Sequence, residues 1–183
     1  MNRLLIPDSG PLFSLAAGNL LPLLARFRVG ITDVVRDETI GRGLLPGASQ
    51  EARSLLAYYN ANAANIETLP TQVGEAIAAK RAIDPDFPVP PNLGELSIQS
   101  LLIGLQLTQP AASPVVLFED SWFLNNAVAL KKPFILLSTQ AFLEYAQEKR
   151  WIASAAQARK AIAKARPRAY EESVTLMGRA LAP

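Results

Sequence analysis

Val115-Val116-Leu117-Phe118-Glu119-Asp120 decides the fold class of this chain, because four consecutive apolar residues that include two valines predict a buried β-strand. A shorter stretch of the same kind, Leu4-Leu5-Ile6-Pro7-Asp8, stands near the N-terminus. Both stretches end at an aspartate. If the two strands are central and parallel, their carboxyl ends lie side by side, and so do the two aspartates.

Helical patterns separate these strands from the others, which predicts parallel pairing. We expect further strands at 29–31, 66–69 and 134–137. We expect helices at 11–17, 20–27, 33–40, 50–61, 73–83, 94–107, 121–130, 139–148, 154–165 and 169–181. The predicted fold is therefore an α/β three-layer sandwich with a central, mainly parallel sheet.

The expected domain organisation is an α/β domain over residues 1–151, followed by a helical extension over 152–183 that packs on the same domain. Four prolines between Asp84 and Pro91 favour an extended loop. We do not place a domain boundary at this loop, because neither half alone completes a sheet.

Composition narrows the possible chemistry. The chain has 183 residues, of which 50% are hydrophobic, and this suits one globular domain. It contains no His and no Cys, which excludes histidine acid–base catalysis, cysteine nucleophiles and thiolate or imidazole metal sites. No apolar run reaches the roughly 18 residues of a membrane span, and the N-terminus is too quickly acidic for a signal peptide. We expect a cytoplasmic protein without a membrane partner.

Four acids occupy positions at which this fold would bring them together: Asp8, Glu38, Glu95 and Asp120. Ligands of open α/β sheets bind outside the carboxyl ends of the strands. Carboxylates crowded there repel one another unless a cation holds them, and hard oxygen ligands suit Mg²⁺ or Mn²⁺. Each acid also has an ordinary explanation. Asp8 and Asp120 can cap the helices that follow them, Glu95 can form a capping box with Asn92, and Glu38 can be a solvated helix residue.

The order of these motifs resembles the PIN-domain nucleases. That family opens with an apolar strand ending in Asp and Ser or Thr, as in Leu4-Leu5-Ile6-Pro7-Asp8-Ser9. A Glu follows on the helix after the second strand, as in the stretch from Ile31 to Glu38. One branch has a Gly-Glu pair opening a helix, as in Leu93-Gly94-Glu95, and then a strand ending in two acids, as in Val115–Asp120. Ser138-Thr139 stands where the family often has Gly-Thr.

The resemblance implies Mg²⁺- or Mn²⁺-dependent cleavage of phosphodiester bonds in RNA by Asp8, Glu38, Glu95 and Asp120. Asp8 and Asp120 would be direct ligands, with Glu38 and Glu95 completing the site directly or through water. Ser9 and Thr139 would support this shell or contact phosphate. Glu119 is either a fifth acid or a surface residue. Such proteins are often toxins of bacterial toxin–antitoxin pairs, so the expected partners are RNA, an antitoxin protein and a second copy of the chain.

Two other readings stay open. The first is a PIN-like protein- or RNA-binding module without catalysis, which the bulky run Ser121-Trp122-Phe123 favours because it could crowd the metal. The second is another aspartate-dependent α/β enzyme. Asp8-Ser9-Gly10 lacks the Asp-x-Asp of haloacid-dehalogenase-type phosphatases, and Lys131 and Lys132 precede their strand, whereas a receiver domain needs a lysine at a strand end. Phosphate-binding glycine motifs are missing from the sequence.

The C-terminal part of the chain is basic. Seven Lys and Arg residues lie between Lys149 and Arg168 without an acid among them, whereas the first 148 residues carry 14 of the 16 acids. A polyanion could bind such a segment, although a solvated helix face gives the same pattern. The predicted RNA contacts are Arg159, Lys160, Lys164, Arg166 and Arg168.

Overall fold

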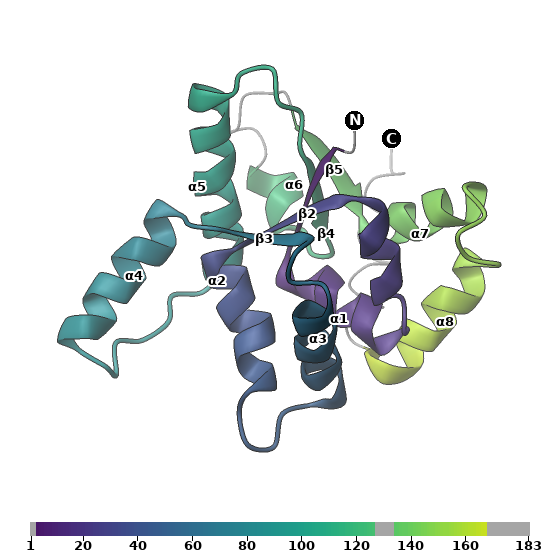
Figure 1. Cartoon of the computed structure of the whole chain (residues 1–183), viewed down its shortest axis with the longest axis horizontal. Helices are drawn as coiled ribbons and strands as arrows, with labels where there is room; N and C mark the ends of the chain where they lie inside the picture. Colours follow the sequence, from purple (N-terminus) through teal and green to yellow (C-terminus); the bar gives the residue numbers. More distant parts are fainter. Residues whose placement is uncertain (1–2, 127–133, 168–183) are drawn as a thin grey trace.

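The computed structural model of the chain describes residues 3–126 and 134–167, and it contains a five-stranded parallel sheet (Figure 1). The strand order is β3-β2-β1-β4-β5. The strands are β1 (Leu4–Pro7), β2 (Arg28–Thr32), β3 (Ile66–Leu69), β4 (Val115–Phe118) and β5 (Ile135–Ser138). The predicted α/β sandwich with a central parallel sheet is confirmed.

The two aspartate-ended strands are direct neighbours at the centre of the sheet. Pro7 of β1 pairs with Leu117 of β4, and the backbone N–H of Asp8 donates to the Leu117 carbonyl at 2.9 Å. This bond extends the pairing of the two strands by one residue past Pro7. The residues that follow β1 and β4 therefore leave the sheet at the same edge.

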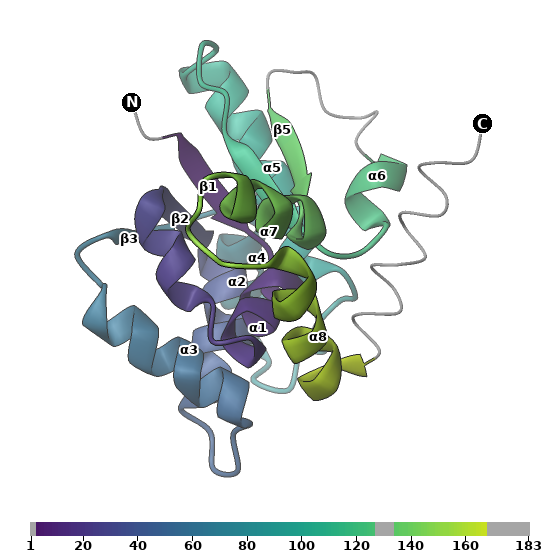
Figure 2. The ribbon, with the colours of Figure 1, turned by 90° about the vertical axis from the view of Figure 1, so that its right-hand side faces the viewer.

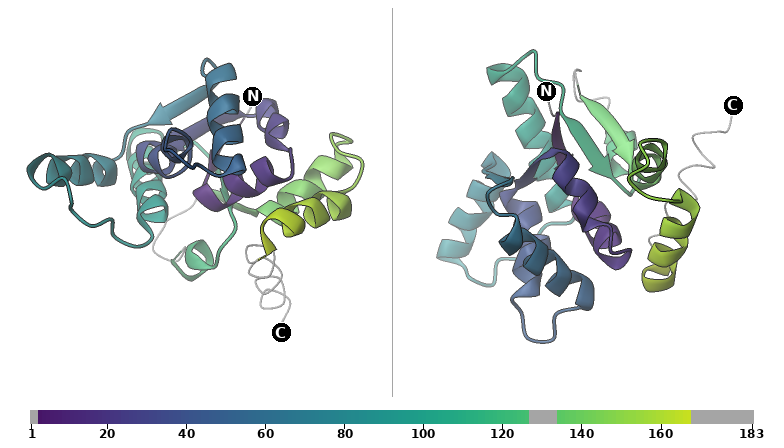
Figure 3. Two further views of the ribbon diagram at one scale, coloured as in Figure 1. Left: turned by 90° about the horizontal axis from the view of Figure 1, so that it is seen from below. Right: turned by 45° about the vertical axis from the view of Figure 1, so that its right-hand side comes forward.

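Helices cover both faces of the sheet (Figures 2 and 3). On one face α1 (Ser9–Ala17) and α7 (Thr139–Glu148) pack against β4, with α3 (Gln50–Ala61) against α1 and α8 (Ala155–Ala165) against both α1 and α7. On the other face α5 (Leu93–Thr108) packs against β2, and α4 (Gln72–Ile83) packs against α5. The right-hand view of Figure 3 shows α5 to the left of the strands and α7 and α8 to the right.

The hydrophobic core lies between these layers. Leu5 and Ile6 of β1, together with Val116 and Leu117 of β4, are fully buried, as expected for apolar strands covered on both sides. Phe142 of α7 is buried against the same core. The rigid centre of the fold therefore supports the edge at which Asp8 and Asp120 lie.

Two predicted helices differ from those observed. Residues 20–27 form a short 3-10 helix, η1 (Leu21–Arg26), with Pro22 in its first turn. The predicted helix 33–40 divides into α2 (Asp33–Arg36) and a π-helical segment, η2 (Asp37–Gly41). In η2 the Thr39 hydroxyl donates to the Val35 carbonyl at 2.6 Å, so the side chain competes for the acceptor of a regular helical bond.

Two further predicted helices fall partly or wholly beyond what the structure covers. The helix expected at 121–130 is represented by α6 (Trp122–Asn126), and its remainder lies outside the described residues. The helix expected at 169–181 lies entirely outside them. Within the described ranges, no helix has the length and apolarity needed to cross a membrane.

Candidate metal centre

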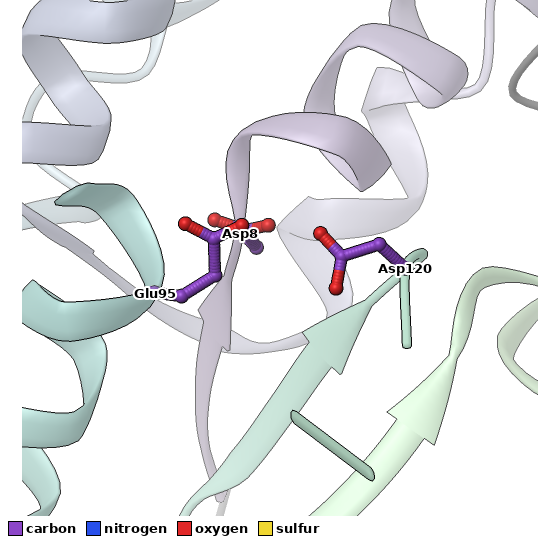
Figure 4. A group of neighbouring side chains, drawn as sticks. All are labelled: Asp8, Glu95 and Asp120. Carbon is purple, nitrogen blue, oxygen red and sulfur yellow. The ribbon is translucent and has the colours of Figure 1, made fainter. Parts of the chain in front are cut away.

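Three of the four predicted acids meet at the carboxyl edge of the sheet. One carboxylate oxygen from each of Asp8, Glu95 and Asp120 lies within 4.8 Å of the other two. Figure 4 shows Glu95 reaching from α5 on one side and Asp120 from the end of β4 on the other, with Asp8 between them. Three segments that are far apart in the sequence thus supply one acidic cluster.

Asp8 is the most buried member of the cluster, with a relative exposure of 3%. It occupies the N-cap position of α1, yet its side chain accepts no cap hydrogen bond from that helix, all of which is described. Its Oδ1 has no hydrogen-bond partner among residues 3–126 and 134–167. A buried carboxylate oxygen without a partner is costly, and a cation in the cluster would satisfy it. The helix-cap explanation of Asp8 therefore does not account for its side chain.

Glu95 stands in the first turn of α5, and a buried polar network fixes that turn. The Ser97 hydroxyl donates to the Gly94 carbonyl at 2.6 Å and shares a 2.7 Å hydrogen bond with the hydroxyl of Thr32, at the end of β2. The capping box expected with Asn92 is not formed, since Asn92 makes no side-chain cap bond to the described α5. The network ties the start of α5 to the end of β2, and this directs Glu95 toward the sheet edge.

Glu38 borders the same space from η2. A methyl group added at Gly94 would lie 2.8 Å from Glu38 Oε2 and 3.3 Å from Asp8 Oδ1. The absence of a side chain at Gly94 therefore lets both carboxylates approach the start of α5. Ser9, a predicted supporting residue, contacts Glu38 through its hydroxyl. All four predicted acids thus surround one volume, with Glu38 at its side.

Asp120 and Glu119, the two acids that follow β4, point to different surroundings. Asp120 joins the cluster, and its Oδ1 also accepts the backbone N–H of Trp122 at 2.8 Å, so it begins α6 as well. Glu119 is buried and binds Arg166 at 3.2 Å and Ser14 at 3.0 Å. The surface position considered for Glu119 is therefore wrong, and its ion pair separates it from the acidic cluster.

Thr139 is buried beside Glu119. Its hydroxyl donates to the Phe118 carbonyl at 3.5 Å, and it also contacts the Glu119 side chain. These contacts support the end of β4. The predicted contact of Thr139 with phosphate stays a prediction.

Burial raises the pKa of three acids of the site, and the negative charges of neighbouring acids add to this for two of them, Asp8 and Glu95. The pKa of Asp8 lies well above its ordinary value, mainly because of burial and then because of the negative charge of Glu95. Burial, together with the proximity of Asp120 and Glu38, raises the pKa of Glu95 to about 7. Burial also raises the pKa of Glu38, although Arg42 and the Ser9 hydroxyl oppose this. Glu95 accordingly holds a proton below about pH 7 unless a cation replaces it.

These shifts predict an unusual pH dependence of stability without metal. Between about pH 4.5 and about pH 7 the folded chain keeps a proton on Glu95 that the unfolded chain releases, so the free energy of unfolding falls as the pH rises through this range. We expect a loss on the order of 1 kcal/mol, because solvent partly screens Glu95.

Thermal melts in EDTA over this pH range would measure the effect. Glu95→Gln should flatten the curve, and Mn²⁺ should flatten it in the unaltered protein. The prediction would be contradicted if the free energy of unfolding without metal rose from pH 4.5 to pH 7 and Glu95→Gln left this rise unchanged.

The predicted RNA contacts of the basic segment have different surroundings. Lys160 and Lys164 on α8 are exposed, and Arg159 is partly buried. Arg166 turns inward, where its Nη1 donates to the Gly10 carbonyl at 2.7 Å and to Ser14 Oγ at 2.6 Å in addition to Glu119. Arg168 lies outside the described residues. Arg166 is therefore engaged in holding the end of α8 to α1 and β4.

Sequence reasoning missed the roles of Ser14, Arg42 and Arg166. Ser14 lies in an apolar helix and gives no pattern of its own, and Arg166 is 47 positions from Glu119. Arg42 follows η2, and only the folded chain shows that its charge acts on Glu38.

Comparisons with known proteins give no relative: no protein-family model, curated protein or solved structure matches the chain. The function has to be inferred from the side chains of the site.

Proposed function

We propose that this protein is a Mg²⁺- or Mn²⁺-dependent ribonuclease of the PIN-like kind, which cleaves RNA phosphodiester bonds. The observation that carries the proposal is the buried, unpartnered Oδ1 of Asp8 within a cluster of three carboxylates. The cluster offers only oxygen ligands, which Mg²⁺ and Mn²⁺ prefer. Gly94 lets the carboxylates of Asp8 and Glu38 lie close to the start of α5, where a side chain would collide with Glu38.

Each carboxylate has a role that follows from its surroundings. Asp8 and Asp120 would hold the cation from adjacent strand ends, and Glu95 would complete the set from α5. A bound Mg²⁺ or Mn²⁺ supplies Lewis acidity toward the scissile phosphate and lowers the pKa of water. Glu38 stands beside the cluster next to Ser9 and Arg42, and it can orient the attacking water and accept its proton.

A toxin role and an antitoxin partner are part of the proposal only through the PIN resemblance. The same holds for a second copy of the chain as a partner. A cytoplasmic location is proposed from the composition, since the lack of cysteine is consistent with a reducing compartment.

The alternative, a PIN-like binding module without catalysis, depended on crowding by the bulky run after Asp120. Phe123 is buried and packs against Phe118, with ring centroids 6.1 Å apart. Trp122 packs edge-on against Phe123 at 5.2 Å. The ring of Phe123 thus belongs to the core, and this favours the catalytic reading.

A cleavage assay with single-stranded RNA tests the proposal. The purified protein should cut RNA in Mn²⁺ or Mg²⁺ and stop when EDTA is added. Asp120→Asn should abolish cutting, whereas Asp86→Asn, an equivalent change in the exposed proline loop, should leave it intact. Cleavage that survives both EDTA and Asp120→Asn would come from a contaminant or another site. An absence of cleavage in metal would leave the binding module as the better reading.

A further inference from the structure

A cavity of about 590 Å³ adjoins the acidic cluster between α2, η2 and α4. Glu38 lines the cavity and also lies close to Gly94, and Leu93, which lines the cavity too, immediately precedes Gly94 and Glu95. Glu38 is therefore the acid through which the cavity borders the acidic cluster. The volume lies in the range of about 300–1,000 Å³ that is typical of small-ligand sites.

The cavity combines apolar walls with arginines. Ile77 of α4, Val89 of the proline loop and Leu93 of α5 give it apolar surface. Arg36, Arg42 and Arg81 also line it. The proline-rich segment 84–91 thus contributes Val89 to the lining, and the prolines on either side of Val89 restrict its backbone.

Two of the four acids that line the cavity, Asp33 and Asp37, are already engaged, and the other two are Glu38 and Glu75. Asp33 accepts the Thr71 hydroxyl at 2.8 Å and the backbone N–H groups of Val34 and Thr71. Asp37 binds Arg36 at 2.8 Å. Arg42 and Arg81, in contrast, form no ion pair with any carboxylate of residues 3–126 and 134–167. These two guanidinium groups are available to an anionic ligand.

We infer that this cavity binds an unpaired nucleotide next to the scissile phosphate, with its base against the apolar walls and its phosphate on Arg42; this inference rests on the proposed ribonuclease function. A base becomes accessible to such a cavity only when it leaves a duplex, and guanidinium groups stack on bases and pair with phosphates. Arg42 suits the phosphate contact because it lines the cavity and its charge acts on Glu38, which borders the acidic cluster. It also lines a second cavity of about 440 Å³ with Phe13 and Arg166, so a strand can continue past it.

Two adjacent alanines of α4 provide a matched test. Ala78 and Ala79 are both exposed, but of the two only Ala78 is among the described residues that line the cavity. Ala78→Trp fills the cavity, and Ala79→Trp places the same side chain beside it. Binding of a short fluorescent single-stranded RNA is measured by anisotropy in an Asp120→Asn background, which prevents cutting. Ala78→Trp should weaken binding by about tenfold or more, as expected for loss of a stacked base, and Ala79→Trp should not.

The metal site serves as the internal control. In the otherwise unaltered protein, both tryptophan variants should retain the Mn²⁺-induced rise in melting temperature. If Ala78→Trp fails to fold, Arg42→Gln replaces it, with Arg53→Gln on the exposed side of α3 as its control. Arg42→Gln should weaken RNA binding and reduce the salt dependence by a slope of about 0.7, whereas Arg53→Gln should change neither.

The outcomes separate this inference from the proposed function. Two results would overturn the nucleotide site, even if the unaltered protein cuts RNA. One is equal RNA affinity in the two tryptophan variants, and the other is no RNA binding by the Asp120→Asn protein that carries neither tryptophan. The cavity would then suit another ligand, such as a peptide. Selective weakening by Ala78→Trp supports the site. If the unaltered protein then binds RNA but does not cut it in Mn²⁺, the ribonuclease proposal fails and the nucleotide site stands.

Discussion

Replacing Asp8 by asparagine is expected to reduce RNA cleavage by about a thousandfold or more, because the most buried carboxylate of the cluster is lost from the proposed cation site. The same variant should be more stable than the unaltered protein without metal. Asparagine carries no charge, so burial and the repulsion from Glu95 no longer act on this position. Its amide group can also donate to the neighbouring carboxylates. We expect a rise in melting temperature in EDTA of about 2–4 °C, which corresponds to about 1 kcal/mol for a chain of this size.

In saturating Mn²⁺ the order should be reversed, so that the unaltered protein is more stable than Asp8→Asn. Saturating Mn²⁺ stabilises a folded protein that binds it by mass action, and a hundredfold excess over the dissociation constant gives about 2.7 kcal/mol. The unaltered protein should show this gain, and Asp8→Asn should show little of it. Asp86→Asn removes the same charge from the exposed proline loop and should behave as the unaltered protein does. An Asp8→Asn protein that is less stable than the unaltered one in EDTA, yet responds fully to Mn²⁺, would mean that Asp8 is a structural residue.

The fold was predictable because its signals are local. The apolar runs that end at Asp8 and Asp120 indicate buried strands, and helical spacing between strands requires parallel pairing. The adjacency of β1 and β4 was predictable because both are unbroken apolar runs, which are typical of central strands that are buried on both faces of a parallel sheet. The helix at 33–40 was predicted without its π-helical part, because the bond from Thr39 to Val35 depends on a side-chain rotamer that no periodicity reveals.

The members of the acidic cluster could be predicted from the sequence, but the directions of their side chains could not. Strand ends and first helical turns located Asp8, Glu95 and Asp120, since these positions converge at one edge of a parallel sheet. Which acid of the pair Glu119-Asp120 faces the cluster depends on the direction in which the chain leaves β4. That direction becomes evident only once Ser14 and Arg166 are seen to hold Glu119.

Arg166→Gln is expected to destabilise the protein by roughly 3 kcal/mol at neutral pH, because it leaves the buried Glu119 carboxylate without its cation. Burial already raises the pKa of Glu119, while Ser14 and Arg166 lower it. Without Arg166 this pKa should rise further, and Glu119 should become neutral at a higher pH. A carboxyl group whose folded pKa exceeds its unfolded pKa contributes stability at low pH and loses it as the pH rises. The deficit of Arg166→Gln should therefore be largest at neutral pH and should shrink toward about pH 5.

Urea denaturation of four proteins would measure this coupling: the unaltered chain, Arg166→Gln, Glu119→Gln and the double variant. The double variant should recover most of the stability lost in Arg166→Gln, since a neutral amide at position 119 needs no cation and can still accept from Ser14. Lys164→Gln, an exposed change on the same helix, should have an effect within about 0.5 kcal/mol. If Arg166→Gln were as mild as Lys164→Gln at neutral pH, the ion pair would not be what holds the end of α8 against α1 and β4. Equal losses in Arg166→Gln and the double variant would show that Arg166 acts through its bonds to Gly10 and Ser14 instead of through Glu119.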